Sequence, residues 1–208
     1  VVENKLRMPL LQVLAQATTP FLPDIPSTQR QELASDLLAF FADRLKVHLR
    51  EHGVRHDLIS AVFALGGEDD LVRLLSKVDV LATFLNTDDG ANLLTAFRRA
   101  ANILRIEEKA DGVTYDGVYD PEALVQDEEN ALGTTMLISS ARVVEAVREG
   151  EFSKAMLELA KLRRPVDDFF DRVTVNADDP ALRKNRLSLL AHVTWTMNLI
   201  ADFSQIEG

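Results

Sequence analysis

The chain has 208 residues, and 47% of them are hydrophobic, which is enough to build the core of one large domain or two small ones. It contains no cysteine, so disulfides, thiolate metal sites and cysteine nucleophiles are excluded, and a reducing cytoplasm is the expected compartment. Neither a signal peptide nor an apolar run of about eighteen residues occurs, so secretion and a membrane span are not predicted.

The first 27 residues contain four prolines, which interrupt any long helix. We expect only a short helix near residues 10–17, followed by an irregular connection. Because the chain begins with Val1 rather than Met, it is expected to be a fragment of a longer polypeptide. Residues 1–27 are then predicted to be a linker, or the remnant of a preceding domain.

From residue 28 onward, apolar spacing and helix-end signals predict helix almost throughout. Thr28 stands where a helix cap is expected, and Gly53 where that helix stops. Aspartates are predicted to begin the following helices, since their side chains accept hydrogen bonds from the free N–H groups of a helix start. Helices are accordingly predicted over 28–52, over 57–65, from Asp69 or Asp70, and from Asp88 or Asp89 to about Lys109.

The second half of the chain also reads as helix, after a break at 111–120. This stretch, DGVTYDGVYD, has no helical period, so a surface loop or short hairpin is predicted. Further helices are predicted with Pro121 in a first turn, up to Gly150, over 152–163, from Pro165, and from Asp179 to Ile206. No alternating run is long enough to predict a sheet. The predicted fold class is therefore all-α, a multi-helix bundle.

The last predicted helix combines an apolar stripe with a basic start. Leu187 and Leu190 lie on the stripe and are expected in the core, so their loss should destabilise the fold. Arg183, Lys184 and Arg186 crowd the first turns, where the helix dipole already favours an anionic partner. Arg183 is expected to be dispensable for folding.

The net charge of −10 opposes contact with nucleic-acid phosphates, but the acid is unevenly distributed. Residues 111–160 carry three cations and eleven anions, whereas the windows 91–110 and 161–190 are net positive. These two windows are the candidate RNA-contacting surfaces. Mixed charges on exposed helix faces are also what an ordinary cytoplasmic protein shows, and that interpretation stays open.

Two clusters have the spacing of metal ligands but lack the rest of the pattern. DDFFD at 167–171 matches the aspartate motif by which helical prenyl synthases hold magnesium and diphosphate, but no second acidic motif faces it. His48 and His52 stand four apart, like zinc-protease ligands, without the glutamate that follows the first histidine in that motif. No metal, cofactor or catalytic site is predicted in this segment.

Several blocks of the sequence closely resemble the bacterial glycyl-tRNA synthetase β subunit, in the same order. They are ENKLRMPL (3–10), HDLISAVFALGGEDDL (56–71), RRAANILR (98–105), LAKLRRPVDDFFD (159–171), FFDRVTVNADDPALRKNRLSLL (169–190) and ADFSQI (201–206). The resemblance covers nearly all 208 residues and implies the C-terminal part of that subunit, which ends in a DALR-type anticodon-binding domain. It implies a helical domain over 28–208, with an extension over 28–90 packed on a DALR-like core over 91–208.

The resemblance also implies what the chain binds. It would hold the anticodon arm of glycine tRNA, while the α subunit of the heterotetramer carries the active site that uses glycine, ATP and magnesium. Neither a membrane nor DNA is expected as a partner. The glycine anticodon ends in two cytosines, whose recognition requires carboxylate acceptors, arginine or amide donors, and aromatic or apolar stacking.

Donors suited to this task lie in the two basic windows. The candidate tRNA-binding residues are Arg98, Arg99, Asn102, Arg105, Arg183, Lys184 and Arg186. Helical spacing places Arg98, Asn102 and Arg105 on one face.

Other side chains in these windows have a second interpretation. Phe169, Phe170 and Trp195 are able to stack on bases, but aromatics at helical spacing are expected in the core. Asn102 and Asn185 are alternatively expected to bridge or cap helices.

Two further functional classes fit a helical bundle. A protein-interaction scaffold would bind a partner through apolar grooves without RNA sequence selectivity. A prenyl or diphosphate enzyme would bind divalent metal at Asp167, Asp168 and Asp171.

Overall fold

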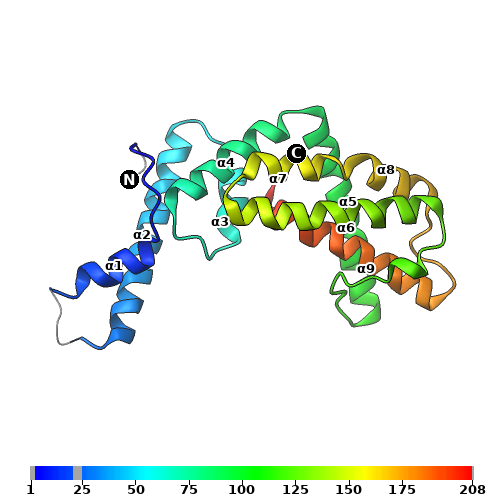
Figure 1. The fold of residues 1–208 in the computed structure, drawn as a ribbon, viewed down its shortest axis with the longest axis horizontal. Helices are drawn as coiled ribbons and strands as arrows, with labels where there is room; N and C mark the ends of the chain where they lie inside the picture. The colour runs from blue at the N-terminus through cyan, green and yellow to red at the C-terminus, as the bar shows by residue number, and fades with distance from the viewer. Residues whose placement is uncertain (1–2, 21–24, 208) are drawn as a thin grey trace.

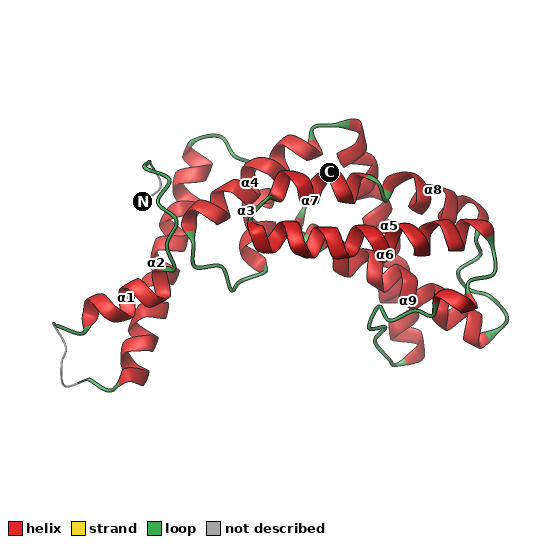
Figure 2. Cartoon of the chain, in the orientation of Figure 1, coloured by secondary structure: helices red, strands yellow, loops and turns green. Residues whose placement is uncertain are grey.

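The computed structural model describes residues 3–20 and 25–207, and in these ranges the only regular secondary structure is helix (Figure 2). The predicted all-α class is confirmed. Part of the predicted connection over 1–27 lies outside the described residues. The helices are α1 (Leu10–Thr18), α2 (Ser27–Glu51), α3 (His56–Ala64), α4 (Leu71–Leu85), α5 (Asp88–Asp111), α6 (Asp127–Glu149), α7 (Phe152–Ala160), α8 (Arg163–Arg172) and α9 (Pro180–Met197), with 3₁₀ helices η1 (Pro121–Ala123) and η2 (Phe203–Gln205).

Helix starts follow the predicted capping chemistry, with small shifts of position. The carboxylates of Asp70 and Asp179 accept hydrogen bonds from first-turn N–H groups of α4 and α9. At α5 the capping side chain is Thr87, one residue before the predicted aspartates. The prediction for Thr28 is wrong, because α2 begins one residue earlier, after Pro26, without a side-chain cap.

Three predicted boundaries in the second half are also wrong. After Pro121 only one 3₁₀ turn forms, and α6 begins further on. The helix predicted over 152–163 ends at Ala160, because the chain turns at the fully buried Leu162, whose carbonyl then accepts from the Val166 N–H of α8. Pro165 therefore lies within the first turn of α8 rather than opening that helix.

α1 and the first part of α2 form an arm that projects from the rest of the molecule (Figure 1). α1 packs along α2, and α2 makes far fewer contacts with α3. Because α2 has 25 residues, it spans roughly 37 Å at about 1.5 Å per residue, which carries its first half away from the body. Phe40, Phe41 and Val47 stay exposed along it.

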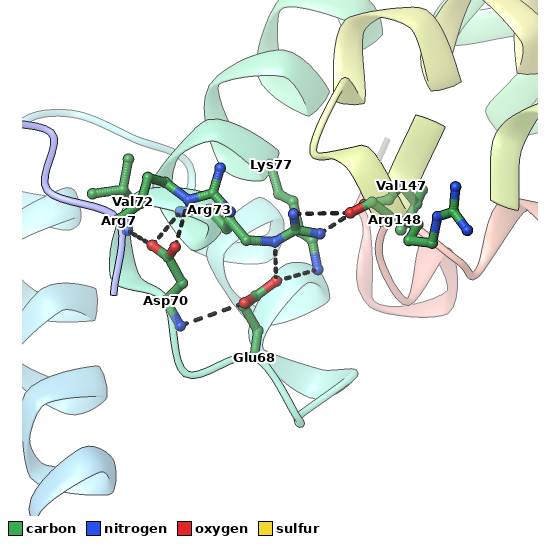
Figure 3. A network of polar contacts seen from close by, with 8 residues as sticks. All are labelled: Arg7, Glu68, Asp70, Val72, Arg73, Lys77, Val147 and Arg148. Carbon is green, nitrogen blue, oxygen red and sulfur yellow. Dashed lines mark hydrogen bonds and ion pairs between the residues drawn. The ribbon is translucent and has the colours of Figure 1, made fainter. Parts of the chain in front are cut away.

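A polar network joins the segment before α1 to α4 and to the end of α6 (Figure 3). Arg7 pairs with Asp70, the same carboxylate that caps α4. Glu68 accepts from Arg73 at 2.8 Å and lies 3.5 Å from the Lys77 ammonium. Arg73 also donates to a carbonyl in the last turn of α6 at 2.6 Å, where helix carbonyls lack intrahelical partners. The network thereby fastens the N-terminal elements to the larger body.

α9 is the central helix of that body, packed mainly on α5 and α6. Leu187, Leu189, Leu190 and Val193 are all buried along it, so its buried apolar side chains lie on more than one side of the helix rather than on a single stripe. The predicted core positions Leu187 and Leu190 are confirmed, each with no exposed surface.

The last helix is shorter than predicted, because α9 ends at Met197 and the following residues fold back on the body. The Asp202 N–H donates to the Ala61 carbonyl of α3 at 2.8 Å, and η2 packs on α3 and α5. Phe203 and Ile206 are buried there. An apolar repeat of three to five residues fits these compact turns as well as it fits a helix, so the repeat alone does not separate the two.

A buried ion pair connects α9 to α6. Arg186 and Glu129 are 5% and 0% exposed, and the Arg186 Nε donates to the Glu129 carboxylate at 2.5 Å. Arg186 Nη1 also donates to the Thr174 carbonyl at 2.7 Å, while Glu129 Oε2 accepts from the Val125 N–H at 2.9 Å. One ion pair therefore joins two helices to the loops that precede them.

We predict that Leu190→Ala lowers the free energy of unfolding by about 2–5 kcal/mol, because it removes buried methyl groups and leaves a cavity. Leu137→Ala is the matched control, since Leu137 lies on α6 with 65% of its surface exposed, and it should have little effect. Urea unfolding of both variants measures the difference. Equal losses would contradict the central position of α9.

Arg186→Ala is predicted to cost about 3–5 kcal/mol, because it leaves the Glu129 carboxylate buried without its countercharge. Arg164→Ala removes an arginine whose side chain is 92% exposed and should leave stability nearly unchanged. Thermal melts of the two variants provide the comparison, and a similar melting temperature for both would show that the buried pair is unimportant.

Candidate nucleic-acid interface

The two basic windows of the sequence come together because α5 and α9 pack side by side in opposite directions. Arg183, in the first turn of α9, lies against the last turns of α5, where it contacts Glu107 and Asp111 at 2.5 and 2.9 Å. Near the other end of α9, Trp195 shares a hollow with Phe97 from the middle of α5. Arg183 and Trp195 therefore both lie along the contact between α5 and α9.

Arg183 is held by its own carboxylate cluster. Hydrogen bonds to Asp111 and Glu107 raise the pKa of Arg183 above its ordinary value, and hydrogen bonds from Tyr115 and Arg183 lower that of Asp111. The cation that opposes the helix dipole is thus neutralised within the chain. These ion pairs revise the expectation that Arg183 is dispensable for folding, and a measurable loss of stability is expected instead.

Two other residues at the start of α9 are also engaged internally. Arg186 is the buried partner of Glu129 described above. The Asn185 amide exchanges two hydrogen bonds, of 2.7 and 2.9 Å, with the backbone of Asp120, the bridging arrangement expected of a buried amide. Lys184 is exposed. Direct contact of Arg183 and Arg186 with RNA stays a prediction, and their observed partners give both a structural role.

On α5 the candidate side chains differ in how far they are exposed to solvent. Arg98 is half-buried and donates to the Ile206 carbonyl of the C-terminal tail at 2.8 Å. Arg99 is exposed, with its guanidinium 4.4 Å from the centre of the Phe170 ring. Asn102 and Arg105 are exposed and joined by a 2.9 Å hydrogen bond, which confirms their predicted common face. Of the candidate cations on α5, Arg99 and Arg105 are therefore the exposed ones.

A surface hollow of about 500 Å³ lies between α5, α9 and the C-terminal tail. Its apolar lining includes Phe97, Leu104 and Ala191, and Trp195 forms a wall. The prediction that Phe169 and Phe170 are core residues is confirmed, but the same prediction for Trp195 is wrong, since 51% of its surface is exposed.

His192 connects this hollow to the loop over 112–120 and was not singled out by the sequence pattern. Its Nδ1 lies 3.1 Å from the Gly117 carbonyl, which assigns the ring proton to Nδ1. Burial lowers the pKa of the ring, so it is neutral near pH 7. Gly117 has φ 77°, in the left-handed region that favours glycine. A Cβ atom at this position would also lie only 3.1 Å from the His192 backbone, so both the conformation and the close approach require glycine here.

The described residues contain no cluster of three or more histidine, aspartate or glutamate side chains arranged to hold a metal ion. Asp167 and Asp168 of the DDFFD stretch instead lie 3.9 Å from Arg163 and Arg164, one turn earlier on α8. Across 3–20 and 25–207, no helix has both the length and the apolar character to cross a membrane.

Comparison with known proteins matches both the core and the whole chain. The family model of the DALR anticodon binding domain matches residues 93–206, which include most of α5 and all of α9. The glycine–tRNA ligase β subunit of Rhodospirillum centenum is 54% identical over 100% of this chain and 29% of its own length. Those of Phenylobacterium zucineum and Cereibacter sphaeroides are 53% and 43% identical, over 85% and 99% of this chain and 26% and 29% of theirs.

The chain thus spans less than a third of the length of these curated relatives. The resemblance to the glycyl-tRNA synthetase β subunit read from the sequence blocks is confirmed. Because the family model covers more than half of the chain, including both helices of the candidate interface, the chain belongs to the family of DALR anticodon binding domains.

Proposed function

We propose that this chain binds the anticodon arm of glycine tRNA as a module of a glycyl-tRNA synthetase β subunit. The family match over residues 93–206 is the observation that carries the proposal. The relatives that match the chain along 83–100% of its length are named as glycine–tRNA ligase β subunits, which points to glycine tRNA. In this role the module positions tRNA and performs no chemistry itself.

The distribution of charge supports the same function. On α5, Arg99 and Arg105 face solvent, and Lys184 is exposed on the neighbouring α9. Cations that form no ion pair within the chain are available to contact RNA phosphates. Each such contact releases counterions from the RNA, which favours binding at low salt. The whole chain has a net charge of −10, which disfavours RNA contacts elsewhere on the surface.

The larger assembly is part of the proposal. ATP-dependent aminoacylation, with magnesium, takes place at the α subunit, and the α and β subunits form a heterotetramer in the cytoplasm. The segment itself needs neither a metal nor a cofactor. We further propose that residues 28–90 form a helical extension on the DALR-like core of 91–208, an arrangement supported by the packing of α4 on α5 and α7.

We predict that this chain binds glycine tRNA more tightly than the same tRNA with a changed middle anticodon base, and that binding weakens steeply between low and moderate salt. Fluorescence anisotropy of labelled tRNA measures both effects. Equal binding of the two tRNAs would mean that the chain contributes only charge. No binding of either would favour the protein-scaffold alternative.

Arg105→Ala is predicted to weaken tRNA binding about tenfold while leaving the melting temperature unchanged, because its guanidinium is exposed and its hydrogen bond to Asn102 lies within the same helix. Arg148→Ala is the matched control: this arginine is also exposed, but it lies at the C-terminal end of α6 beside Glu149. The proposal for α5 is contradicted by equal effects of the two substitutions on affinity.

A further inference from the structure

Trp195 is an exception on α9. Every residue from Asn185 to Ala191 on this helix is buried, yet one turn further on 51% of the Trp195 surface is open to solvent. The ring is not loose, because it packs edge-to-face against His192, with centroids 5.7 Å apart, and His192 is itself fixed to Gly117. An exposed but immobilised indole offers a flat stacking surface that costs little ordering when a planar group binds it.

The adjoining hollow is large enough to receive one planar ring. Its volume of about 500 Å³ falls within the ordinary range for small-molecule pockets. Phe97, Leu104 and Ala191 form an apolar floor, the indole forms one side, and polar side chains that include Glu108, Asp116 and Asp202 make up much of the remaining lining. A planar ring that enters the hollow is therefore able to bury one face on the indole and its edge among polar groups of the rim.

Acceptors on the rim are carboxylates held in place by the fold. Asp202 Oδ1 accepts from the Ser204 N–H and hydroxyl, which fixes the carboxylate, whereas its Oδ2 has only a long contact of 3.4 Å from Gln205. Glu108 is fixed in a similar way by the Tyr115 N–H at 2.9 Å. Each carboxylate keeps unused acceptor capacity.

Donors on the rim are fixed as well. Asn198 Oδ1 accepts from the Phe203 N–H at 3.2 Å, which leaves the Asn198 amide nitrogen as the outward donor. Arg105, on α5, uses one nitrogen for Asn102 and has further N–H groups. The rim therefore presents carboxylate acceptors together with cationic and amide donors around one hollow.

We infer that the hollow between α5 and α9 receives a single unstacked cytosine of RNA, with its ring on Trp195 and its amine on Asp202. Cytosine carries an amine donor beside two acceptors, the complement of a carboxylate next to Asn198 and Arg105. Uracil places a carbonyl where cytosine has the amine, so it would face the Asp202 carboxylate and be rejected. The inference rests on the proposed function, because the base reaches the hollow only if the chain binds RNA.

Trp195 provides its own reporter, since it is the only tryptophan of the chain. The experiment titrates the chain with labelled glycine tRNA, following anisotropy of the label for binding and tryptophan fluorescence for stacking. The same titration is repeated with each anticodon cytosine changed singly to uracil. The expected result is quenching of Trp195 fluorescence that is lost when one particular cytosine is replaced, with affinity weakened by about tenfold.

Variants separate stacking from hydrogen bonding. Trp195→Ala should weaken binding about tenfold, whereas Trp195→Phe, which keeps an aromatic face, should weaken it much less. Asp202→Asn keeps an oxygen for capping η2 but removes the charge, so it should abolish the preference for cytosine over uracil at that position. Asp79→Asn, an exposed aspartate on α4, is the matched control and should leave the preference intact. Melting temperatures verify that each variant folds.

The two readouts distinguish the possible failures. Anisotropy that reports binding without quenching, or with equal quenching by the uracil-substituted tRNAs, would overturn the cytosine pocket and leave the proposed function standing. No binding of any tRNA by the unchanged chain would overturn both.

Discussion

The buried pair of Arg186 and Glu129 is the constraint on which the rest of the structure depends. Charges this deeply buried are stable only when their remaining donors and acceptors are satisfied, and the Thr174 carbonyl and Val125 N–H supply those contacts. These contacts hold α9 against α6 in the observed rotation. That rotation puts Leu187 and Leu190 in the core and turns the later part of α9 toward α5, where the hollow forms.

The basic residues of α5 and α9 have two roles: some form ion pairs that stabilise the fold, and others face solvent, where a partner can contact them. Arg183 and Arg186 meet carboxylates from α5 and α6, so the most basic stretch of the sequence is largely neutralised inside the molecule. Arg105 remains outward on α5 and lines the hollow, whereas Arg99 is exposed beside Phe170 of α8. On a protein with a net charge of −10, a polyanion is favoured only where cations gather on the surface, which favours selectivity over raw affinity.

Features that depend only on nearby residues in the sequence could be predicted from it. The caps at Asp70 and Asp179 and the core leucines of α9 are local signals of this kind. The partners of Arg186 could not be predicted, because Glu129 lies 57 residues earlier and only tertiary packing brings the two together. For the same reason the exposure of Trp195 was missed: its side of α9 is left uncovered where the tail turns away to pack on α3 and α5.

The central claim is that RNA contacts the α5–α9 junction rather than the projecting arm. Glycine tRNA carrying photoreactive 5-bromocytidine in the anticodon tests it most directly, because irradiation links the base to the side chains that touch it, and mass spectrometry then identifies the linked peptides. The account predicts cross-links to peptides from residues 98–117 and 191–205. Cross-links confined to α1 and α2, or to the outer face of α6, would contradict it.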